Sequence, residues 1–212
     1  MKNKNVKEFK ITANGSRCPP EVAVAIKELY ATRPELQGNI RKDDSWIQTY
    51  TGKKFYPLNP RIEDIDIEDI AHALSMVCRY TGHCQKFFSV AEHSVLVSYL
   101  GDEKFGLLHD GSECYIADIA SPIKRMPEFS FYRDIEKNLQ TMIYRKFGLI
   151  SPEPDSLKKA DLLMLSTEAY YLLNPLHPEW KIPYKPLPIQ VKCLPPAEAK
   201  ILFLDRFHEL FG

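Results

Sequence analysis

The stretch that decides the fold runs from residue 89 to residue 124 and reads SVAEHSVLVSYLGDEKFGLLHDGSECYIADIASPIK. Ser89 is followed three residues later by Glu92, which is the pattern of a capping box. We therefore expect a helix to begin here and to carry His93 in its first turns. This helix should stop near Gly101, and a second helix should start near Asp102.

The break at Gly101 decides whether two histidines can meet. In one continuous helix, His109 would lie sixteen residues after His93 and roughly 160° around the axis, at about 100° per residue. If the second helix folds back instead, the two imidazoles can converge. Glu113 follows His109 by four residues and Asp110 by three, so on a helix it shares their face. With Asp118 added, the stretch offers two imidazoles and up to three carboxylates to one point.

Mixed imidazole and carboxylate ligands suit one divalent transition-metal ion, namely manganese, iron(II), cobalt, nickel or zinc, in a catalytic site. Alternatively, His93 is a histidine on a helix surface, and the pair His109–Asp110 only caps or pairs at a buried helix. The apolar residues Leu107 and Leu108 lead directly into this pair and direct it to the interior. An unpaired carboxylate is costly there, so we expect a cation to meet it.

These residues resemble the HD-domain metal-dependent phosphohydrolases, and within them the bacterial and phage group that acts on nucleotides. The family pattern H…HD…D is similar to His93, then His109–Asp110, then an aspartate on a later helix, for which Asp161 in LKKADLLMLSTEA is the best candidate. The surrounding text also matches, in SVAEHS at the first histidine and in HDxSE, a later aspartate and SPxK over residues 109–124. The resemblance covers roughly residues 46–173.

This resemblance implies an all-α fold, the HD-domain helical bundle. It also implies a metal held by His93, His109, Asp110 and Asp161. Glu113 would then orient or deprotonate the attacking water, and Asp118 would protonate the leaving oxygen or hold a sugar hydroxyl. The implied substrate is a nucleotide, most of all a deoxynucleotide, which loses either its 5′-phosphate as a monophosphate or its phosphates as a triphosphate. A cyclic or signalling nucleotide, or a non-enzymatic interaction module stabilised by the metal, remain alternatives.

A loop before the first metal histidine carries candidate phosphate contacts. Arg79 lies fourteen residues before His93 and is similar to the phosphate-contacting arginine of the family. A guanidinium binds two phosphate oxygens at once, but a surface salt bridge is the alternative for Arg79. Tyr80 can stand against a base or sugar, and His83 can contact phosphate or cap a helix. Near the end of the stretch, Lys124 can meet a phosphate or be a solvated charge.

The rest of the sequence predicts one domain of mostly helical character at residues 46–212, after an extension at residues 1–45 with a short helix at residues 21–31. Alternation of bulky and polar residues around Gly52 predicts a small β-hairpin at residues 46–60. Helical periodicity predicts further helices at residues 65–77, 131–147, 156–173 and 197–210, six or seven helices in all. The proline-rich residues 174–196 should form a loop that covers one edge of the pocket.

Composition limits the class of protein. The chain has 212 residues, enough for one domain, and its 28 basic and 28 acidic residues give a net charge of zero. This balance argues against a nucleic-acid polymer as partner, so any phosphate site must be local. Five cysteines without CxxC spacing indicate reduced thiols. The sequence lacks a long apolar run and a signal-peptide pattern, so we expect a soluble cytoplasmic protein with no membrane partner, in which the extension can support a homo-oligomer.

Overall fold

A computed structural model of the chain describes residues 45–212, and the structural statements that follow refer to this part. The helix predicted at residues 21–31, and all but the last residue of the predicted extension, lie outside the described residues. The described residues form one compact unit, Ser45–Gly212. None of the helices in this unit has both the length and the apolar character needed to span a membrane.

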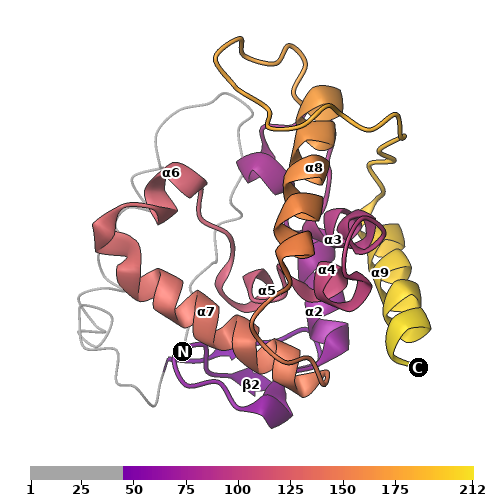
Figure 1. Cartoon of the computed structure of the whole chain (residues 1–212). Coiled ribbons are helices and arrows are strands. Elements are labelled where there is room, and N and C mark those ends of the chain that lie inside the picture. The colour runs from indigo at the N-terminus through magenta and orange to yellow at the C-terminus, as the bar shows by residue number, and fades with distance from the viewer. Residues whose placement is uncertain (1–44) are drawn as a thin grey trace, which may run out of the picture. The chain divides into compact units, whose positions relative to one another are not determined.

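The described unit is all-α with one small β-hairpin, as predicted (Figure 1). Strands β1 (Ile47–Gln48) and β2 (Lys54–Phe55) pair antiparallel, with Ile47 opposite Phe55. The α-helices are α2 (Ile67–Met76), α3 (Val90–Ser98), α4 (Glu103–Leu108), α5 (Glu113–Ile116), α6 (Ser121–Lys124), α7 (Ser130–Lys146), α8 (Asp155–Leu172) and α9 (Pro196–Phe211). Three 3₁₀ turns join them, η3 (Ile62–Asp64), η4 (Arg79–Gly82) and η5 (Pro127–Phe129). Residues 45–212 thus contain eight α-helices, of which α5 and α6 are single turns that the periodicity did not predict.

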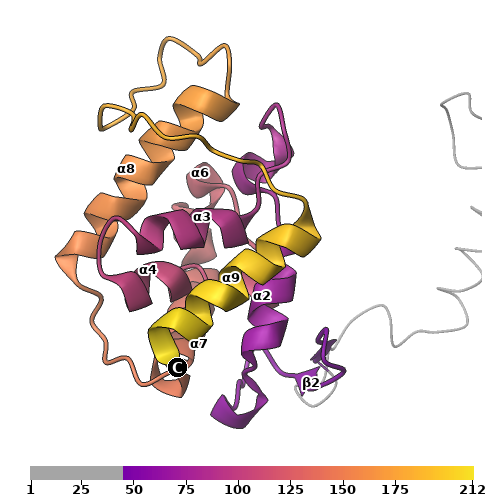
Figure 2. The same ribbon diagram turned by 90° about the vertical axis from the view of Figure 1, so that its right-hand side faces the viewer.

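Helix α3 lies at the centre of the helices that build the site. It contacts α2, α4, α8 and α9, and Figure 2 shows it among them. Eight of its nine residues are buried, which include the polar residues Glu92, His93 and Ser94. Its start is as predicted, because Ser89 Oγ accepts the backbone N–H of Glu92 at 3.1 Å. The sequence predicted that this helix carries His93 to a site. The structure adds that the helix itself is buried among its neighbours.

Gly106 brings α4 against α3. A Cβ atom at Gly106 would lie 2.8 Å from Ser98 Cα and 3.0 Å from Ser98 N, closer than any side chain allows. The glycine therefore lets the two helix backbones touch just after the predicted break at Gly101. Helix α4 ends two residues beyond this contact, at Leu108, and His109 then lies beside His93.

The second helix does not continue through His109 to Glu113, so that prediction was wrong. In an uninterrupted helix the N–H of Ser112 would bond the carbonyl of Leu108. The buried side chain of Gln140, on α7, takes both groups instead, since its Nε2 donates to Leu108 O at 2.7 Å and its Oε1 accepts from Ser112 N at 2.9 Å. Helix α4 therefore ends at Leu108, and Glu113 begins the separate turn α5.

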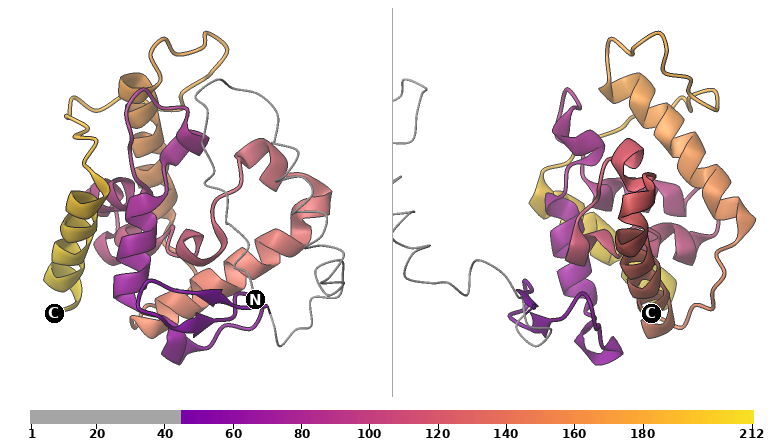
Figure 3. Two further views of the ribbon diagram at one scale, coloured as in Figure 1. Left: turned by 180° about the vertical axis from the view of Figure 1, so that it is seen from behind. Right: turned by 90° about the vertical axis from the view of Figure 1, so that its left-hand side faces the viewer.

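Helix α8 is held against α3 by a small apolar cluster, which consists of Val97, Leu157, Ala160 and Met164. This packing fixes the rotation of α8, so Asp161 and Glu168 face α3. The right view of Figure 3 shows α8, in orange, running alongside the shorter central helices. Most other buried apolar residues form a larger cluster, to which the hairpin and helices α2, α3, α7 and α9 contribute.

The proline-rich residues 174–195 have no helix or strand, as predicted. The end of this loop is tied to α3 by the carboxylate of Glu92, which accepts the backbone N–H groups of Lys192, Cys193 and Leu194 at 3.0, 3.1 and 2.7 Å. Glu92 therefore does not complete a capping box with Ser89. It anchors a loop that arrives a hundred residues later in the chain.

Candidate metal centre

Three side chains from three different parts of the fold form a group that could hold a metal ion, namely His93, His109 and Asp161. His93 comes from α3, His109 follows α4, and Asp161 comes from α8. The Nε2 atom of His93 lies 3.2 Å from Nε2 of His109 and 3.3 Å from Oδ1 of Asp161. His109 Nε2 is 3.9 Å from the same carboxylate oxygen. The predicted convergence of the two imidazoles is therefore confirmed.

Hydrogen bonds on the far side of each ring set which nitrogen faces the centre. His109 Nδ1 must donate to the carbonyl of Gly106, 2.8 Å away, because a carbonyl can only accept. His93 Nδ1 lies 2.5 Å from the carboxylate of Glu168 and donates to it. In the neutral rings both Nε2 atoms then carry lone pairs that point at one another. Two acceptors 3.2 Å apart repel each other unless a cation or a proton lies between them.

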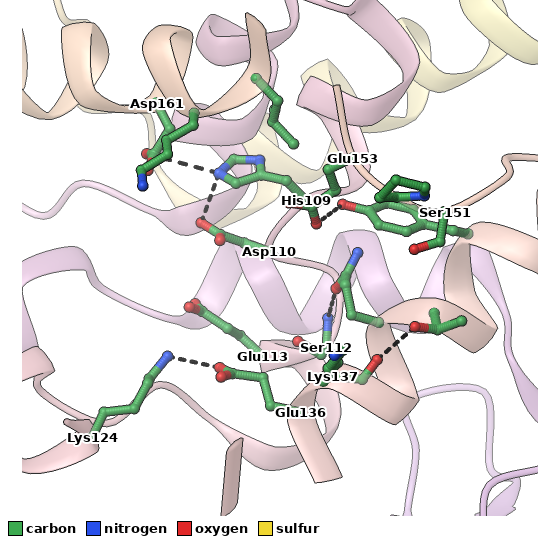
Figure 4. Close-up of a pocket in the computed structure, with 16 residues that line it drawn as sticks. His109, Asp110, Ser112, Glu113, Lys124, Glu136, Lys137, Ser151, Glu153 and Asp161 are labelled. Atoms are coloured by element: carbon green, nitrogen blue, oxygen red, sulfur yellow. Dashed lines mark hydrogen bonds and ion pairs between the residues drawn. The ribbon is translucent and has the colours of Figure 1, made fainter. Parts of the chain in front are cut away.

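Asp110 adds a second carboxylate at the edge of this group. Its Oδ2 lies 3.3 Å from His109 Nε2 and 3.6 Å from His93 Nε2. Figure 4 shows Asp110 and Asp161 both directed toward the same nitrogen of the His109 ring. Ligands at about 2.1 Å from one ion are separated by about 3.0 Å at right angles and about 3.4 Å in a tetrahedron. The separations around the two imidazoles are thus of the size that a shared ion requires.

The electrostatics of the centre favour positive charge. Burial alone would raise the pKa of Asp161, but its hydrogen bond to His93 and the charges of His93, His109 and Arg79 hold it well below the usual range. Burial and the charge of Arg79 oppose protonation of His93, yet the carboxylates of Glu168 and Asp161 raise its pKa to about 9. The ionised carboxylate of Asp161 therefore faces the imidazole of His93, and the surroundings of both groups attract a cation.

Glu168 is the residue that the sequence prediction missed. Its side chain is fully buried on α8, with Oε1 at His93 Nδ1 and Oε2 accepting from Arg79 Nε at 2.9 Å and from the Tyr80 hydroxyl at 3.3 Å. Burial would raise the pKa of Glu168, but the charges of Arg79 and His93 lower it. The signal was present in the sequence, since Glu168 follows Asp161 by seven residues, two helical turns on one face.

Arg79 is not a surface salt bridge. Its side chain is 15% exposed, and besides Glu168 it approaches Asp110, with Nη1 3.6 Å from Oδ2. Burial would lower its pKa, but the carboxylates of Glu168 and Asp110 raise it, so the guanidinium stays charged. Tyr80 and Thr81 directly after it have φ angles of 56° and 53°, the left-handed conformation that non-glycine residues seldom adopt. Such backbone strain is common where a loop must present side chains to a site.

Glu113 lines the same cavity as His109, Asp110 and Asp161, although it is on a different turn from His109. Its side chain is 9% exposed, and its Oε2 atom has no hydrogen-bond partner among residues 45–212. Burial, and then the charges of Asp110 and Asp118, raise the pKa of Glu113 well above the usual range. A buried carboxyl oxygen without a partner is costly, and it commonly marks a catalytic role or a ligand.

Asp118 and Lys124 lie further from the metal group. Lys124 Nζ bonds Asp118 at 3.1 Å and Glu136 at 2.7 Å, and the second contact is visible in Figure 4. Burial would lower the pKa of Lys124, but its bonds to these two carboxylates raise it. Its charge is thus already matched within the protein. The roles of Asp118 in proton transfer and of Lys124 in phosphate binding stay predictions.

Two cavities have Glu113 in their lining. One, of about 620 Å³, is lined by His109, Asp110, Asp161 and Lys124 among others. The other, of about 580 Å³, contains the predicted substrate residues Arg79, Tyr80 and His83, together with Asp118 and the loop residue Trp180. Glu113 lines both cavities, whose volumes lie in the range of small-molecule sites. The loop at residues 174–196 was predicted to cover one edge of the pocket, and its residue Trp180 lines the second cavity.

No protein-family model matches the chain. Two relatives are similar over most of its length. The uncharacterized protein YfdR of Escherichia coli (strain K12) is 37% identical over 174 residues, which cover 78% of this chain and 96% of the relative. The uncharacterized protein RCAP_rcc00048 of Rhodobacter capsulatus is 32% identical over 188 residues, which cover 78% of this chain and 95% of the relative.

Proposed function

This chain belongs to the same protein family as YfdR of Escherichia coli, and we propose that it is a metal-dependent phosphohydrolase that acts on nucleotides. The names of its relatives state no activity, so the proposal depends on the site. It is also supported by the resemblance of His93, His109–Asp110 and Asp161 to the metal ligands of HD-domain phosphohydrolases.

The observation that carries the proposal is the convergence of His93 and His109 Nε2 with the carboxylate of Asp161. Both Nδ1 atoms are bonded to acceptors, so two neutral imidazoles cannot relieve the contact by turning an N–H inward, and a cation or a proton has to lie between the Nε2 atoms. Nitrogen and oxygen donors without thiolate suit manganese, iron(II), cobalt, nickel or zinc. When bound, such an ion would polarise a phosphoryl oxygen and lower the pKa of water from 15.7 toward about 7.

Glu113 is suited to take a proton from the attacking water. Its buried Oε2 is free of partners, and a carboxylate whose pKa is raised is a stronger base than an ordinary glutamate. The two neighbouring carboxylates Asp110 and Asp118 favour the protonated form of Glu113 once the transfer has occurred. Asp118, in the second cavity, would then return a proton to the leaving oxygen or hold a sugar hydroxyl.

Arg79 supplies positive charge on the other side of the centre. Its Nε is fixed on Glu168, which leaves the Nη groups directed toward Asp110 and the cavity. A guanidinium held in this way is suited to balance the oxygens of a phosphate group as negative charge develops on them.

The second cavity is suited to the nucleoside part of the substrate. The rings of Tyr80 and Trp180 lie edge to face, 6.0 Å apart, at its wall, and aromatic faces of this kind stack on bases. Because Glu113 lines both cavities, a nucleotide with its base near Trp180 would bring its phosphate to the metal group. We propose a deoxynucleotide, by resemblance to the family, either as a monophosphate or as a triphosphate.

A nucleotide panel tests the proposal. The protein is freed of metal, reloaded with each of the five ions, and incubated with ribo- and deoxynucleoside mono- and triphosphates and with cyclic nucleotides. Released phosphate, pyrophosphate and triphosphate are measured separately. We expect hydrolysis that requires the ion and is lost in His109→Ala. Tight metal binding without hydrolysis of any nucleotide would contradict the proposal and favour an interaction module stabilised by the metal.

A further inference from the structure

We infer that Glu168 is a positioning residue that holds the metal ligand His93 and the phosphate contact Arg79 in one arrangement. Its effect on His93 concerns metal binding alone. Its effect on Arg79 rests on the proposed function, because it takes Arg79 to bind the anionic group of the substrate. Neither the family resemblance nor the two relatives assign a role to this residue.

The contacts of Glu168 divide cleanly between its two oxygens. Oε1 lies 2.5 Å from His93 Nδ1, and Oε2 accepts from Arg79 Nε at 2.9 Å and from the Tyr80 hydroxyl at 3.3 Å. The side chain is fully buried, so water does not compete for these bonds. One carboxylate thus joins α3, the η4 turn and α8 at a single point.

Only a carboxylate can serve this arrangement. All three groups around Glu168 are donors, and one of them is a buried guanidinium that requires a negative partner. An amide of the same shape has one acceptor oxygen and one donor nitrogen, so it can satisfy one side and must oppose an N–H on the other. The choice of glutamate rather than glutamine therefore follows from its two partners together.

Each partner depends on Glu168 in a different way. For His93, the bond at Nδ1 holds the ring in the tautomer whose Nε2 lone pair faces the metal group, and such bonds also make the ligand more basic. For Arg79, the bond at Nε leaves the two Nη groups free to face the cavity and Asp110. The strained turn at Tyr80 and Thr81 is held to α8 by the same carboxylate through the Tyr80 hydroxyl.

Glu92→Gln provides a matched control for Glu168→Gln. Glu92 is a glutamate that is 2% exposed and accepts three hydrogen bonds, but all three come from the backbone of the loop at residues 192–194. The same substitution there should lower stability without changing the ligands. A difference between the two variants therefore reports position in the site and not the general cost of a buried amide.

The test measures two affinities in the full chain, without any turnover. Cobalt(II) binding is measured by titration calorimetry and by the visible absorption of the bound ion. Sulfate, an unreactive tetrahedral anion, is then titrated into protein saturated with cobalt. We expect Glu168→Gln to weaken cobalt binding by about 10- to 100-fold and to change the absorption spectrum at saturation. Sulfate binding should weaken about tenfold, and this loss should vanish when Arg79→Gln is already present.

Three results would overturn the inference. They are cobalt affinity in Glu168→Gln within twofold of the unaltered protein, an equal loss in Glu92→Gln, and a sulfate effect that persists undiminished in the Arg79→Gln background. If Glu168→Gln does not fold, Glu168→Asp keeps the charge but is one methylene too short to reach both partners. Unaltered affinities and spectrum in Glu168→Asp would likewise overturn it. Failure of the proposed function is distinguishable, since a protein that hydrolyses no nucleotide can still show the cobalt effect.

Discussion

Replacing Glu113 with glutamine should separate catalysis from stability. The change keeps the shape of the side chain but removes its ability to take a proton. General-base assistance contributes a factor of about 10² to 10⁴ in rate, which corresponds to about 2.7 to 5.4 kcal/mol of activation free energy. Because Oε2 of Glu113 has no partner among residues 45–212, the substitution breaks no hydrogen bond of that atom.

The same substitution should leave the fold equally stable or more stable at neutral pH. The folded protein raises the pKa of Glu113 through burial and through Asp110 and Asp118, so between the unfolded and the folded pKa the unfolded chain releases a proton that the folded chain retains. This opposes folding increasingly as the pH rises above the ordinary glutamate value of 4.5. Glutamine does not titrate, so the advantage of Glu113→Gln should be absent below that pH and grow above it.

The assay combines three measurements on one preparation. Metal content is measured by elemental analysis, melting temperature is recorded between pH 4 and pH 8, and nucleotide hydrolysis is followed by released phosphate. We expect full metal content, a melting temperature that is unchanged or raised at pH 7, and the loss of most turnover. Near-normal turnover with the ion retained would refute the role of Glu113 as a base, and loss of the ion would make it a ligand.

Three further predictions concern the scaffold. Gly106→Ala should lower the free energy of unfolding by about 1 to 3 kcal/mol and weaken metal binding, because the added Cβ would lie 2.8 Å from Ser98 Cα. Calorimetry measures the stability and the metal affinity. If neither changes, the close approach of α3 and α4 is contradicted. Gln140→Leu should leave Ser112 N without its partner and Leu108 O with only the backbone N–H of Gly111, and it should cost about 1 to 3 kcal/mol in urea unfolding. A variant of unchanged stability would show that the side chain does not set the break. Asp66→Ala should cost about 1 kcal/mol at pH 7, because Asp66 caps α2. Burial would raise the pKa of Asp66, but Lys53 and the Glu68 N–H lower it, so this difference should shrink as the pH falls below 3.8, and a constant difference would contradict it.

The parts of the fold that depend on neighbouring residues could be predicted from the sequence. The Ser89 cap, the break before Asp102 and the long amphipathic helices follow from local hydrogen bonding and periodicity. The meeting of His93 and His109 was predicted as well, because a break at Gly101 allows the second helix to fold back on the first. These predictions needed no knowledge of distant residues.

The parts that depend on distant residues could not be predicted. Gln140 ends α4 from 32 residues away, and Glu168 reaches His93 across 75 residues. Both are single polar side chains on helices. The spacing of Glu168 from Asp161 places the two on one face of a helix, but no local pattern gives the partners of Glu168 or Gln140. For Glu92 a local pattern was misleading. Its spacing from Ser89 indicated a capping box, but its carboxylate bonds a loop a hundred residues later.

The ion-pair partners of Lys124 also depend on residues that are distant in the sequence. Lys124 was expected either to contact a phosphate or to be a solvated charge, and in the structure its ammonium group bonds Asp118 and Glu136. Its contact with phosphate stays a prediction. The second carboxylate comes from α7, whose position relative to α6 no local pattern gives. Arg79 has carboxylate partners too, but its bond to Glu168 lies at Nε and leaves its Nη groups toward the cavity.

The most direct measurement of the metal centre is the number of divalent ions bound per chain in the unaltered protein and in His109→Ala and Asp161→Asn. Each protein is stripped with a chelator, dialysed against manganese, iron(II), cobalt, nickel or zinc, and measured by elemental analysis and calorimetry. We predict one ion per chain in the unaltered protein and a loss of affinity of at least tenfold in each variant. Undiminished binding in both variants, or no binding of any of the five ions by the unaltered protein, would contradict a metal centre at His93, His109 and Asp161.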